Sequence, residues 1–462
     1  MRASVDNPAT QETAFEYELT PAEALPAIVE SAARAGAELA GMTVAGRIEV
    51  CERFLAAFDA DSEEVARDIS IQMGKPLSES RAELRIMGVR ARHMMALAER
   101  CLAEVRVPPG AGKDGRQRFI EKVPVGVVLD IAAWNYPLLI PVNVVVPALL
   151  AGNAVILKHS SRTPLCAGHF ERAFKQTNAG LALVTGIVAS HDSTAALIAD
   201  PGIGYVAFTG SVEGGRAVSR AAAGRFIDVG LELGGKDPAY VRADADLGVA
   251  VEEIATGAFY NAGQSCCAVE RIYVERSVYG EFVERLCEAA SAWTPGDPLA
   301  DGSKLGPMAK AGAPALISRQ IDEAAHKGAR IPSGGNPASV DGRGRYFEAT
   351  VIADATHDMA VMREESFAPL AAVAAVDGDE EAIRLMNDSP YGLAASIWTA
   401  DMEAARAIGR RVEAGTILVN RCDHLDPALP WAGWKDSGVG LTLSELGFER
   451  LVRTRSFSLP TG

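Results

Sequence analysis

Long hydrophobic runs are missing from this chain of 462 residues. A helix that crosses a membrane needs about 18 to 20 apolar residues without charges, and no such stretch occurs. The longest apolar run, residues 137–151, contains Asn143 and several prolines, and it predicts a buried helix instead. The first 20 residues carry several acids and no apolar centre, so they predict neither a secretory signal nor a transit peptide. We therefore expect a protein without a membrane partner.

The cysteines lack the spacing of a disulfide framework or a zinc site. Their number is odd, no two form a C-x-x-C pair, and no H-E-x-x-H occurs. We therefore predict no bound metal, and free thiols fit a cytoplasmic protein best. The seven cysteines lie at positions 51, 101, 166, 266, 267, 287 and 422.

An excess of basic residues is also missing. The formal net charge is −15 and the isoelectric point is near 5.1, which argues against binding to nucleic acid or anionic lipid. The apolar fraction of 48% and the charged fraction of 23% are ordinary for a soluble globular protein. The length implies two or three folding units.

Strands and helices alternate along most of the chain. Residues 24–104 have apolar positions at helical spacing and predict two or three helices. The Pro/Gly-rich segment 108–115 interrupts this pattern, and residues 233–238 mark the seam before a second run of alternation over 245–430. Such alternation predicts parallel, doubly wound α/β sheets. Strands are predicted at 117–122, 125–132, 154–158, 183–188, 205–208, 226–231 and 453–459.

Several polar residues follow predicted strands directly. In a doubly wound sheet, ligands bind outside the carboxyl ends of the strands, so these residues are candidates for a site. They are Asn135, Lys158, Gly210, Ser211 and Glu232. An amide such as Asn135 has an NH2 donor for a developing oxyanion, and an acid such as Glu232 beside two glycines is either a general base or a satisfied structural acid.

Two further segments carry chemical signals. In residues 261–268 the adjacent Cys266 and Cys267 are either small buried residues or include a nucleophile, which a turn entering a helix would supply with backbone N–H donors. Residues 208–215 place small residues at the start of a predicted helix, a natural phosphate site. No G-x-G-x-x-G stands between a predicted strand and a helix, so the usual dinucleotide fingerprint gives no support.

Taken in order, these segments resemble the aldehyde dehydrogenase superfamily over almost the whole chain. The resemblance rests on eight motifs: WNYP at 134, LKHSSRTP at 157, FTGS at 208, ELGGK at 232, NAGQSCCA at 261, EESFAPL at 364, NDSPYGLAASIW at 387 and PWAGWKDSG at 430. It implies a Rossmann-type doubly wound NAD(P)-binding domain over 1–107 and 125–232. It also implies an α/β catalytic domain over 233–436, and a small β oligomerisation arm and tail over 108–124 and 437–462.

The resemblance implies the role of each catalytic residue. Cys266 would be the nucleophile, the Asn135 side chain and the Cys266 N–H would form the oxyanion hole, and Glu232 would activate the water that hydrolyses a thioester. NAD or NADP would be the cofactor, and an aldehyde would be oxidised to the acid. Residues expected at the cofactor are Trp134, Lys158, Ser161, Gly210, Ser211, Leu233, Glu365 and Phe367. Residues expected at the substrate are Tyr136, Arg421, Leu425 and Trp431.

The sequence departs from the commoner family pattern at a few positions. Ala133 replaces a proline, Asn143 stands where many members have a lysine, and Trp431 replaces a phenylalanine. Ser161 occupies the position that is glutamate in strongly NAD-selective members, which suggests that NADP is usable. The charged residues of 421–426 are either substrate contacts or a solvated loop.

The resemblance leaves alternatives open. A CoA-acylating member has the same fold and nucleophile, although Glu232 argues for water as the acceptor. A catalytically silent structural member is disfavoured by Cys266, Glu232 and Asn135. Family members assemble as dimers or tetramers, so a homodimer or homotetramer is expected.

Overall fold

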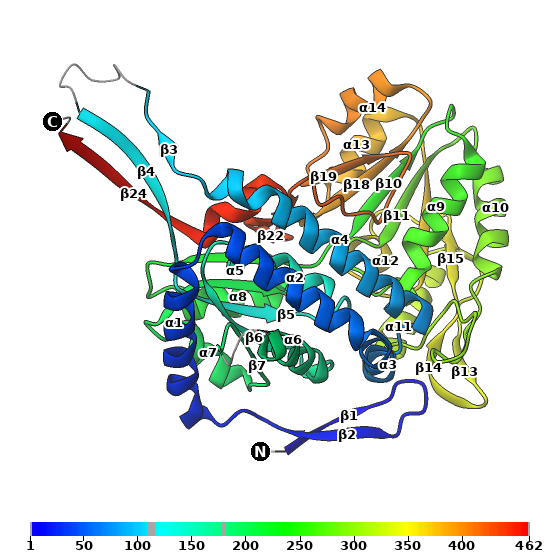
Figure 1. Ribbon diagram of the computed structural model, residues 1–462. Coiled ribbons are helices and arrows are strands. Elements are labelled where there is room, and N and C mark those ends of the chain that lie inside the picture. The colour runs from blue at the N-terminus through cyan, green and yellow to red at the C-terminus, as the bar shows by residue number, and fades with distance from the viewer. Residues whose placement is uncertain (1, 109–115, 178–180, 461–462) are drawn as a thin grey trace.

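The computed structural model describes residues 2–108, 116–177 and 181–460. The chain forms two lobes, each built around one open sheet, and a ribbon that projects from the first lobe (Figure 1). The predicted α/β class with doubly wound parallel sheets is confirmed. Among the described residues, no helix is both long and apolar enough to cross a membrane.

Four helices precede the first sheet, and not the two or three that the sequence predicts. The longest of them, α4 (Leu77–Leu102), runs between the lobes (Figure 1) and packs against α5 (Leu139–Leu150). A hairpin that the sequence analysis did not predict, β1 (Arg2–Asp6) with β2 (Thr13–Glu18), lies before them. The four helices are α1 (Leu25–Ala40), α2 (Val44–Ala60), α3 (Ser62–Met73) and α4 (Leu77–Leu102).

The sheet of the first lobe has six strands in the order β22-β9-β8-β5-β6-β7. Five of them are parallel, and β22 pairs antiparallel with β9. The predicted strand at 226–231 begins later than expected, because Phe226 is fully exposed. The strands are β5 (Val127–Ala132), β6 (Ala154–His159), β7 (Val184–Ile187), β8 (Ile203–Thr209), β9 (Asp228–Glu232) and β22 (Gly438–Val439), and the other connecting helices are α6 (Pro164–Thr177), α7 (His191–Ala199) and α8 (Val212–Ala222).

The sheet of the second lobe has seven strands in the order β12-β15-β16-β11-β10-β18-β19, with only β12 antiparallel. Residues 233–236 connect β9 of the first sheet to β10 of the second, where the sequence predicts the seam. The strands are β10 (Asp237–Val241), β11 (Val269–Glu275), β12 (Arg330–Ser333), β15 (Thr350–Ala353), β16 (Leu370–Val376), β18 (Ala394–Trp398) and β19 (Thr416–Val419). The helices are α9 (Leu247–Phe259), α10 (Tyr279–Ser291), α11 (Ala313–His326), α12 (Ala360–Arg363), α13 (Asp379–Asn387) and α14 (Met402–Gly409).

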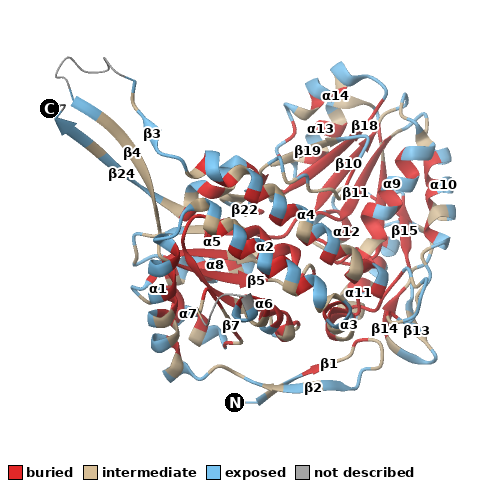
Figure 2. Cartoon of the chain, in the orientation of Figure 1, coloured by how far each residue is buried: buried red, intermediate tan, exposed pale blue. Residues whose placement is uncertain are grey.

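Buried residues follow both sheets and the inner faces of the helices (Figure 2). Strand β5 is buried at all six positions, as expected of a strand covered on both faces. Small pairs of strands and short 3-10 helices complete the fold. They are β13 (Pro337–Val340) with β14 (Arg343–Phe347), β17 (Tyr391–Gly392) with β21 (Trp434–Lys435), β20 (Trp431–Ala432) with β23 (Leu441–Thr442), and the 3-10 helices η1 (Ala22–Ala24), η2 (Tyr260–Gly263) and η3 (Glu445–Leu451).

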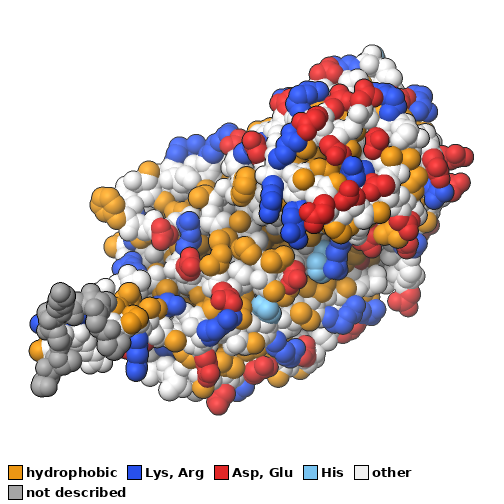
Figure 3. All heavy atoms as spheres, turned by 90° about the horizontal axis from the view of Figure 1, so that it is seen from above, with side chains coloured by type: hydrophobic (Ala, Val, Ile, Leu, Met, Phe, Trp, Pro, Cys, Tyr) orange, Lys and Arg blue, Asp and Glu red, His pale blue; other side chains and the backbone are white. Residues whose placement is uncertain are grey.

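The projecting ribbon consists of β3 (Val105–Arg106), β4 (Arg116–Pro124) and β24 (Val452–Pro460) in one antiparallel sheet (Figure 1). Phe119 and Phe457 stack across it with ring centroids 4.6 Å apart. Residues 109–115, part of the predicted arm, lie outside the described residues. Seen from above, acidic and basic side chains intermix over the second lobe, in agreement with the low basic content of the sequence (Figure 3).

Candidate active site

The segment that carries Cys266 leaves a helix and enters a strand. After α9 the chain makes the turn η2, passes Cys266, and continues as β11. The prediction that this turn enters a helix is therefore wrong. Asn261, Ala262 and Gly263 all have positive φ, between 53° and 66°. Two non-glycine residues in this conformation are strained, and such strain is concentrated at functional sites, where the surrounding structure holds it.

Hydrogen bonds fix this turn in place. The Asn261 amide donates to the carbonyls of Asn135 (3.1 Å) and Gln264 (3.0 Å), and so links the nucleophile segment to the loop after β5. The Gln264 side chain donates to the Asn261 carbonyl and accepts from the backbone N–H of Ala309. A side chain at Gly263 would collide with the carbonyl of Ala368, so only glycine fits there.

The two adjacent cysteines have different surroundings. Cys266 is partly exposed and lines the main cavity between the lobes, whereas Cys267 is buried. The Cys267 thiol lies 3.1 Å from a carboxylate oxygen of Asp423. A hydrogen bond with Cys266, burial and the nearby Asp423 hold the pKa of Cys267 well above its usual range. Cys267 therefore stays a protonated thiol, and Cys266 is the cysteine that a ligand in the cavity can reach.

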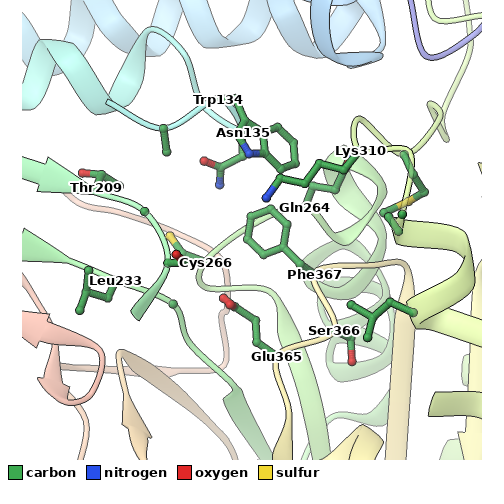
Figure 4. Close-up of a pocket in the computed structure, with 18 residues that line it drawn as sticks. Trp134, Asn135, Thr209, Leu233, Gln264, Cys266, Lys310, Glu365, Ser366 and Phe367 are labelled. Carbon is green, nitrogen blue, oxygen red and sulfur yellow. The ribbon is translucent and has the colours of Figure 1, made fainter. Parts of the chain in front are cut away.

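Two hydrogen-bond donors beside Cys266 are free. The Asn135 side chain comes from the loop between β5 and α5 and lines the same cavity, near Cys266 (Figure 4). Among the described residues, neither its amide nitrogen nor the backbone N–H of Cys266 has a hydrogen-bond partner. Free donors beside a candidate nucleophile can stabilise negative charge that develops on a bound oxygen.

Glu232 ends strand β9 and is held by two hydroxyl groups. Its carboxylate accepts hydrogen bonds from Thr442 (2.6 Å) and Thr209 (3.5 Å). Burial raises the pKa of Glu232 above its usual range, against the opposing effect of these hydrogen bonds. Thr209 lines the main cavity, but Glu232 lines a small adjoining pocket instead. Glu232 itself therefore does not line the main cavity, but its hydrogen-bond partner Thr209 and its sequence neighbour Leu233 do.

The main cavity has a volume of about 380 Å³ and lies where the two sheets meet. Of the residues predicted to bind a cofactor, six line it: Trp134, Gly210, Ser211, Leu233, Glu365 and Phe367. In the close-up view the ring of Phe367 lies below Trp134 and to the right of Cys266 (Figure 4). The centroids of the Phe367 and Trp134 rings are 5.5 Å apart, and Lys310, also in the wall, lies over the Trp134 ring.

A buried ion pair holds the loop with Glu365 and Phe367. Glu270 on β11 accepts hydrogen bonds from the backbone N–H groups of Ser366 (2.8 Å) and Phe367 (2.9 Å), and pairs with Lys236 at 2.5 Å. Glu365 in turn accepts from the N–H of Gly235. Burial raises the pKa of Glu365 to about 7.

The cavity wall fits a dinucleotide. A side chain at Gly234 would meet the Glu365 carboxylate at 2.6 Å, so the backbone there leaves the carboxylate accessible. Ser211 caps α8, and its hydroxyl accepts from the N–H of Gly214, which places the start of a helix at the cavity as predicted for a phosphate site. Lys158 and Ser161 lie apart from the cavity, at and just after the end of β6. Ser161 is exposed, and its carbonyl accepts from the Tyr17 hydroxyl of the N-terminal hairpin.

Two of the four residues predicted at the substrate lie beside the cysteines. Trp431 packs in one cluster with Cys267, and Leu425 and Cys266 lie against that cluster. Tyr136 lies under the Lys75 ammonium group, 4.2 Å from its ring centroid. Arg421 is exposed. The predicted loop 421–426 is thus divided, since Asp423 faces the thiol of Cys267 while Arg421 and Asp426 face solvent.

Comparison with known proteins identifies the family. The family model described as "Aldehyde dehydrogenase family" matches residues 1–457. The chain belongs to the aldehyde dehydrogenase family. The predicted resemblance and the predicted enzyme class, an oxidoreductase of the aldehyde dehydrogenase type, are confirmed.

The relatives include enzymes with different substrates. The chain is 33% identical to the 3,6-anhydro-alpha-L-galactose dehydrogenase of Streptomyces coelicolor, covering 98% of this chain and 92% of the relative. It is 35% identical to an Escherichia coli succinate semialdehyde dehydrogenase named for NAD(P)+, covering 87% and 85%. The structure of Staphylococcus aureus betaine aldehyde dehydrogenase in complex with NAD+ has a TM-score of 0.94 at 28% identity, covering 100% and 92%. The predicted NAD or NADP cofactor agrees with these names.

The sequence analysis missed a group of buried ionisable residues that contact the loops of the candidate active site. Glu79, Glu83 and Arg90 are all buried on α4, and Lys75 lies just before that helix. Glu79 accepts from the N–H of Asn261, and Glu83 pairs with Lys75. A signal for them exists, because Glu79, Glu83 and Arg90 share the helix face of Leu84, Met87 and Ala91. Charges on an apolar helix face are costly unless they are paired or used.

Proposed function

We propose that this enzyme oxidises an aldehyde to the carboxylic acid with NAD+ or NADP+, through a thioester on Cys266. The observation that carries the proposal is one cavity wall that contains an accessible cysteine and two free N–H donors beside it. The names of the relatives support aldehydes as the substrate class.

In the first step, the Cys266 thiolate adds to the aldehyde carbon. The C=O π bond breaks, and its electron pair moves to oxygen. The Asn135 amide and the Cys266 N–H donate hydrogen bonds to that oxyanion. Cys267 takes no part, because its thiol is buried and remains protonated.

In the second step, the tetrahedral adduct becomes a thioester. When bound, the nicotinamide supplies the acceptor for the hydride that leaves the former aldehyde carbon. Phe367 and Trp134 form the wall beside Cys266 and exclude water from this part of the cavity. Glu365, Gly210, Ser211 and Leu233 would hold the rest of the cofactor, with Lys158 and Ser161 beyond them at its adenosine end.

In the third step, water hydrolyses the thioester. Glu232 takes a proton from the water, the oxygen attacks the acyl carbon, and the Cys266 thiolate leaves. Because Thr209 and Thr442 hold the Glu232 carboxylate outside the main cavity wall, the side chain must rotate toward Cys266 for this step. The raised pKa of Glu232 suits a base that must take up a proton and release it again.

An aldehyde panel with NAD+ and NADP+ in parallel tests the proposal. We expect reduced cofactor and carboxylic acid in equal amounts, without added CoA. Acid formation that requires CoA would identify the acylating alternative, and a lack of turnover with every aldehyde would favour a silent member.

The lobes and the assembly follow from the same proposal. We assign residues 1–107 and 125–232 to cofactor binding, 233–436 to catalysis, and the arm and tail, 108–124 and 437–462, to contacts within a homodimer or homotetramer. The projecting antiparallel ribbon, with exposed residues on both of its long strands, supports that assignment. All seven cysteines are free, which supports a reducing compartment such as the cytoplasm.

A further inference from the structure

Helix α4 buries three ionisable side chains on the face that packs against α5. Two of them, Glu79 and Glu83, accept hydrogen bonds from backbone N–H groups. The Glu83 carboxylate accepts from the N–H groups of Leu138 (2.8 Å) and Leu139 (3.2 Å) and pairs with Lys75. Glu79 accepts from the N–H of Asn261 at 3.1 Å. Both acids therefore support the loops that carry Asn135 and Cys266.

The third side chain, Arg90, has no comparable partner. Its side chain is only 7% exposed, and its one hydrogen bond runs from Nη1 to the Asn143 side-chain oxygen at 3.3 Å. The Asn143 amide nitrogen can donate in turn to the Leu139 carbonyl, so Asn143 is satisfied within α5. In the described part of the chain, no carboxylate lies within 4 Å of the Arg90 guanidinium, and Nε is buried without a partner. Nη2 also makes no hydrogen bond to a described residue.

The free edge of Arg90 has a specific chemistry. Nε–H and one Nη–H of a guanidinium point in parallel and match the two oxygens of a carboxylate. Asn143 occupies Nη1, which leaves the edge formed by Nε and Nη2. A buried cation with an unused bidentate edge is costly to the fold unless an anion completes it.

Through its hydrogen bond to Asn143, Arg90 lies against α5, the helix that begins just after Asn135 and Tyr136. Burial raises the pKa values of Glu232 and Asp423, and the positive charge of Arg90 partly opposes that rise. Burial lowers the pKa of His424, and the charge of Arg90 adds to that effect. Arg90 also interacts with Tyr136 and Cys267. These residues come from the β5–α5 loop, the nucleophile segment, the end of β9 and loop 421–426, the elements that carry the proposed catalytic residues and the predicted substrate contacts.

We infer that Arg90 binds a carboxylate on the substrate, so that the preferred aldehydes carry an anionic group at the end opposite the aldehyde. This inference rests on the proposed function. Among the named relatives, succinate semialdehyde dehydrogenase acts on such an aldehyde, whereas betaine aldehyde, a cation, would be repelled by Arg90. Asn143 keeps the guanidinium oriented without neutralising it.

The test compares Arg90→Met with the wild type on two sets of aldehydes. One set consists of straight-chain aldehydes that end in a carboxylate, succinate semialdehyde among them, and the other of uncharged aldehydes of the same lengths. For the best anionic aldehyde, kcat/KM should fall about 30-fold or more, which corresponds to about 2 kcal/mol, the lower end for loss of a buried ion-pair partner. The loss on the uncharged aldehyde should be at least tenfold smaller.

Two further variants keep the test decisive. Arg92→Met, which removes an exposed arginine of the same helix, should leave the ratio of anionic to uncharged kcat/KM unaltered. If Arg90→Met does not fold, as judged by its thermal unfolding, Arg90→Lys keeps the charge but loses the bidentate edge, and should lower the same ratio by less than Met would. Succinate should also slow alkylation of Cys266 in the wild type, and less so in the Arg90 variant.

The outcomes separate the two levels of the proposal. Equal losses on both sets of aldehydes, or a wild type without a preference for anionic aldehydes, would overturn the role of Arg90 and leave the proposed function standing. A wild type that oxidises no aldehyde with either cofactor would overturn the proposed function itself.

Discussion

At the residue scale, the proposed base Glu232 lies in a small pocket beside the main cavity. Two threonine hydroxyls hold its carboxylate, and burial raises its pKa. Glu232→Gln removes the base but not the nucleophile. The variant should therefore release a burst of reduced cofactor approaching one equivalent per active site and then turn over slowly. Stopped-flow absorbance measures both phases, and an unchanged steady-state rate would remove Glu232 from the mechanism.

Asn135 offers the second test at this scale. Its free amide beside Cys266 is the proposed oxyanion donor, and losing one such donor lowers kcat by about 100- to 1000-fold. We expect Asn135→Ala to show a loss of that size in steady-state assays. A loss below about tenfold, with a deuterated aldehyde showing that hydride transfer limits the rate, would contradict the assignment.

The proposed contact of Glu365 with the cofactor predicts that cofactor binding depends on pH. Its pKa is raised to about 7 by burial, and only the ionised carboxylate can accept two hydrogen bonds from a ribose. The affinity for NAD+ should therefore increase as the pH rises from 6 to 8, by up to roughly tenfold, the ratio of the ionised fractions. Titration of protein fluorescence measures Kd at each pH. A Glu365→Gln variant should lose the dependence, and an equal pH dependence in the variant would assign it to another group.

At the element scale, we expect the residues at the end of β6 to set the choice between NAD+ and NADP+. Ser161 is exposed just after this strand, and Lys158 is the second-last residue of the strand. A glutamate at 161 would repel the 2′-phosphate of NADP+. Ser161→Glu should then raise the NAD-over-NADP ratio of kcat/KM by roughly ten- to a hundredfold. Ser161→Ala is the matched control and should change the ratio much less, while a wild type that cannot use NADP+ would contradict the idea.

The elements themselves differ in how far the sequence predicts them. Strands such as β5 and β6 are continuous apolar runs, because a parallel strand is covered on both faces, and their bounds agree with the prediction within about two residues. The N-terminal hairpin has no such run, since its strands are mostly exposed. The turn at Asn261 and Ala262 could not be predicted either. Hydrogen bonds hold its left-handed backbone. Two of them reach Asn135 and Ala309, which lie far from the turn in the sequence, and the bonds between Asn261 and Gln264 form only once the turn itself has formed.

The candidate site shows the same division. Motifs lead to Cys266, Asn135 and the cofactor wall. Asn135 and Gly210 follow strand ends, where ligands of a doubly wound sheet bind, whereas Cys266 precedes strand β11 and is found through its motif alone. Arg90 and its neighbours belong to no motif. Only the packing between α4 and α5 shows that their side chains are buried near the site. The separation of Cys266 from Cys267 likewise depends on Asp423, more than 150 positions away in the chain.

At the scale of the whole molecule, the site exists only where the lobes meet. The first sheet contributes Asn135, Thr209 and the helix start at Ser211, and the second lobe contributes Cys266, Glu365 and Phe367. The short connection at 233–236 is itself part of the cavity wall. Any change that separates the lobes should therefore affect cofactor binding and catalysis together.

The central claim, that Cys266 and not its neighbour forms the thioester, is tested by comparing two variants in one assay. We predict that Cys266→Ala abolishes reduction of NAD(P)+ by the best aldehyde, with an unaltered thermal unfolding temperature, and that Cys267→Ala retains most of the activity. Cys267 is buried against Asp423 and serves packing, so its loss leaves the accessible thiol in place. Activity that survives in Cys266→Ala but is lost in a folded Cys267→Ala would contradict the account.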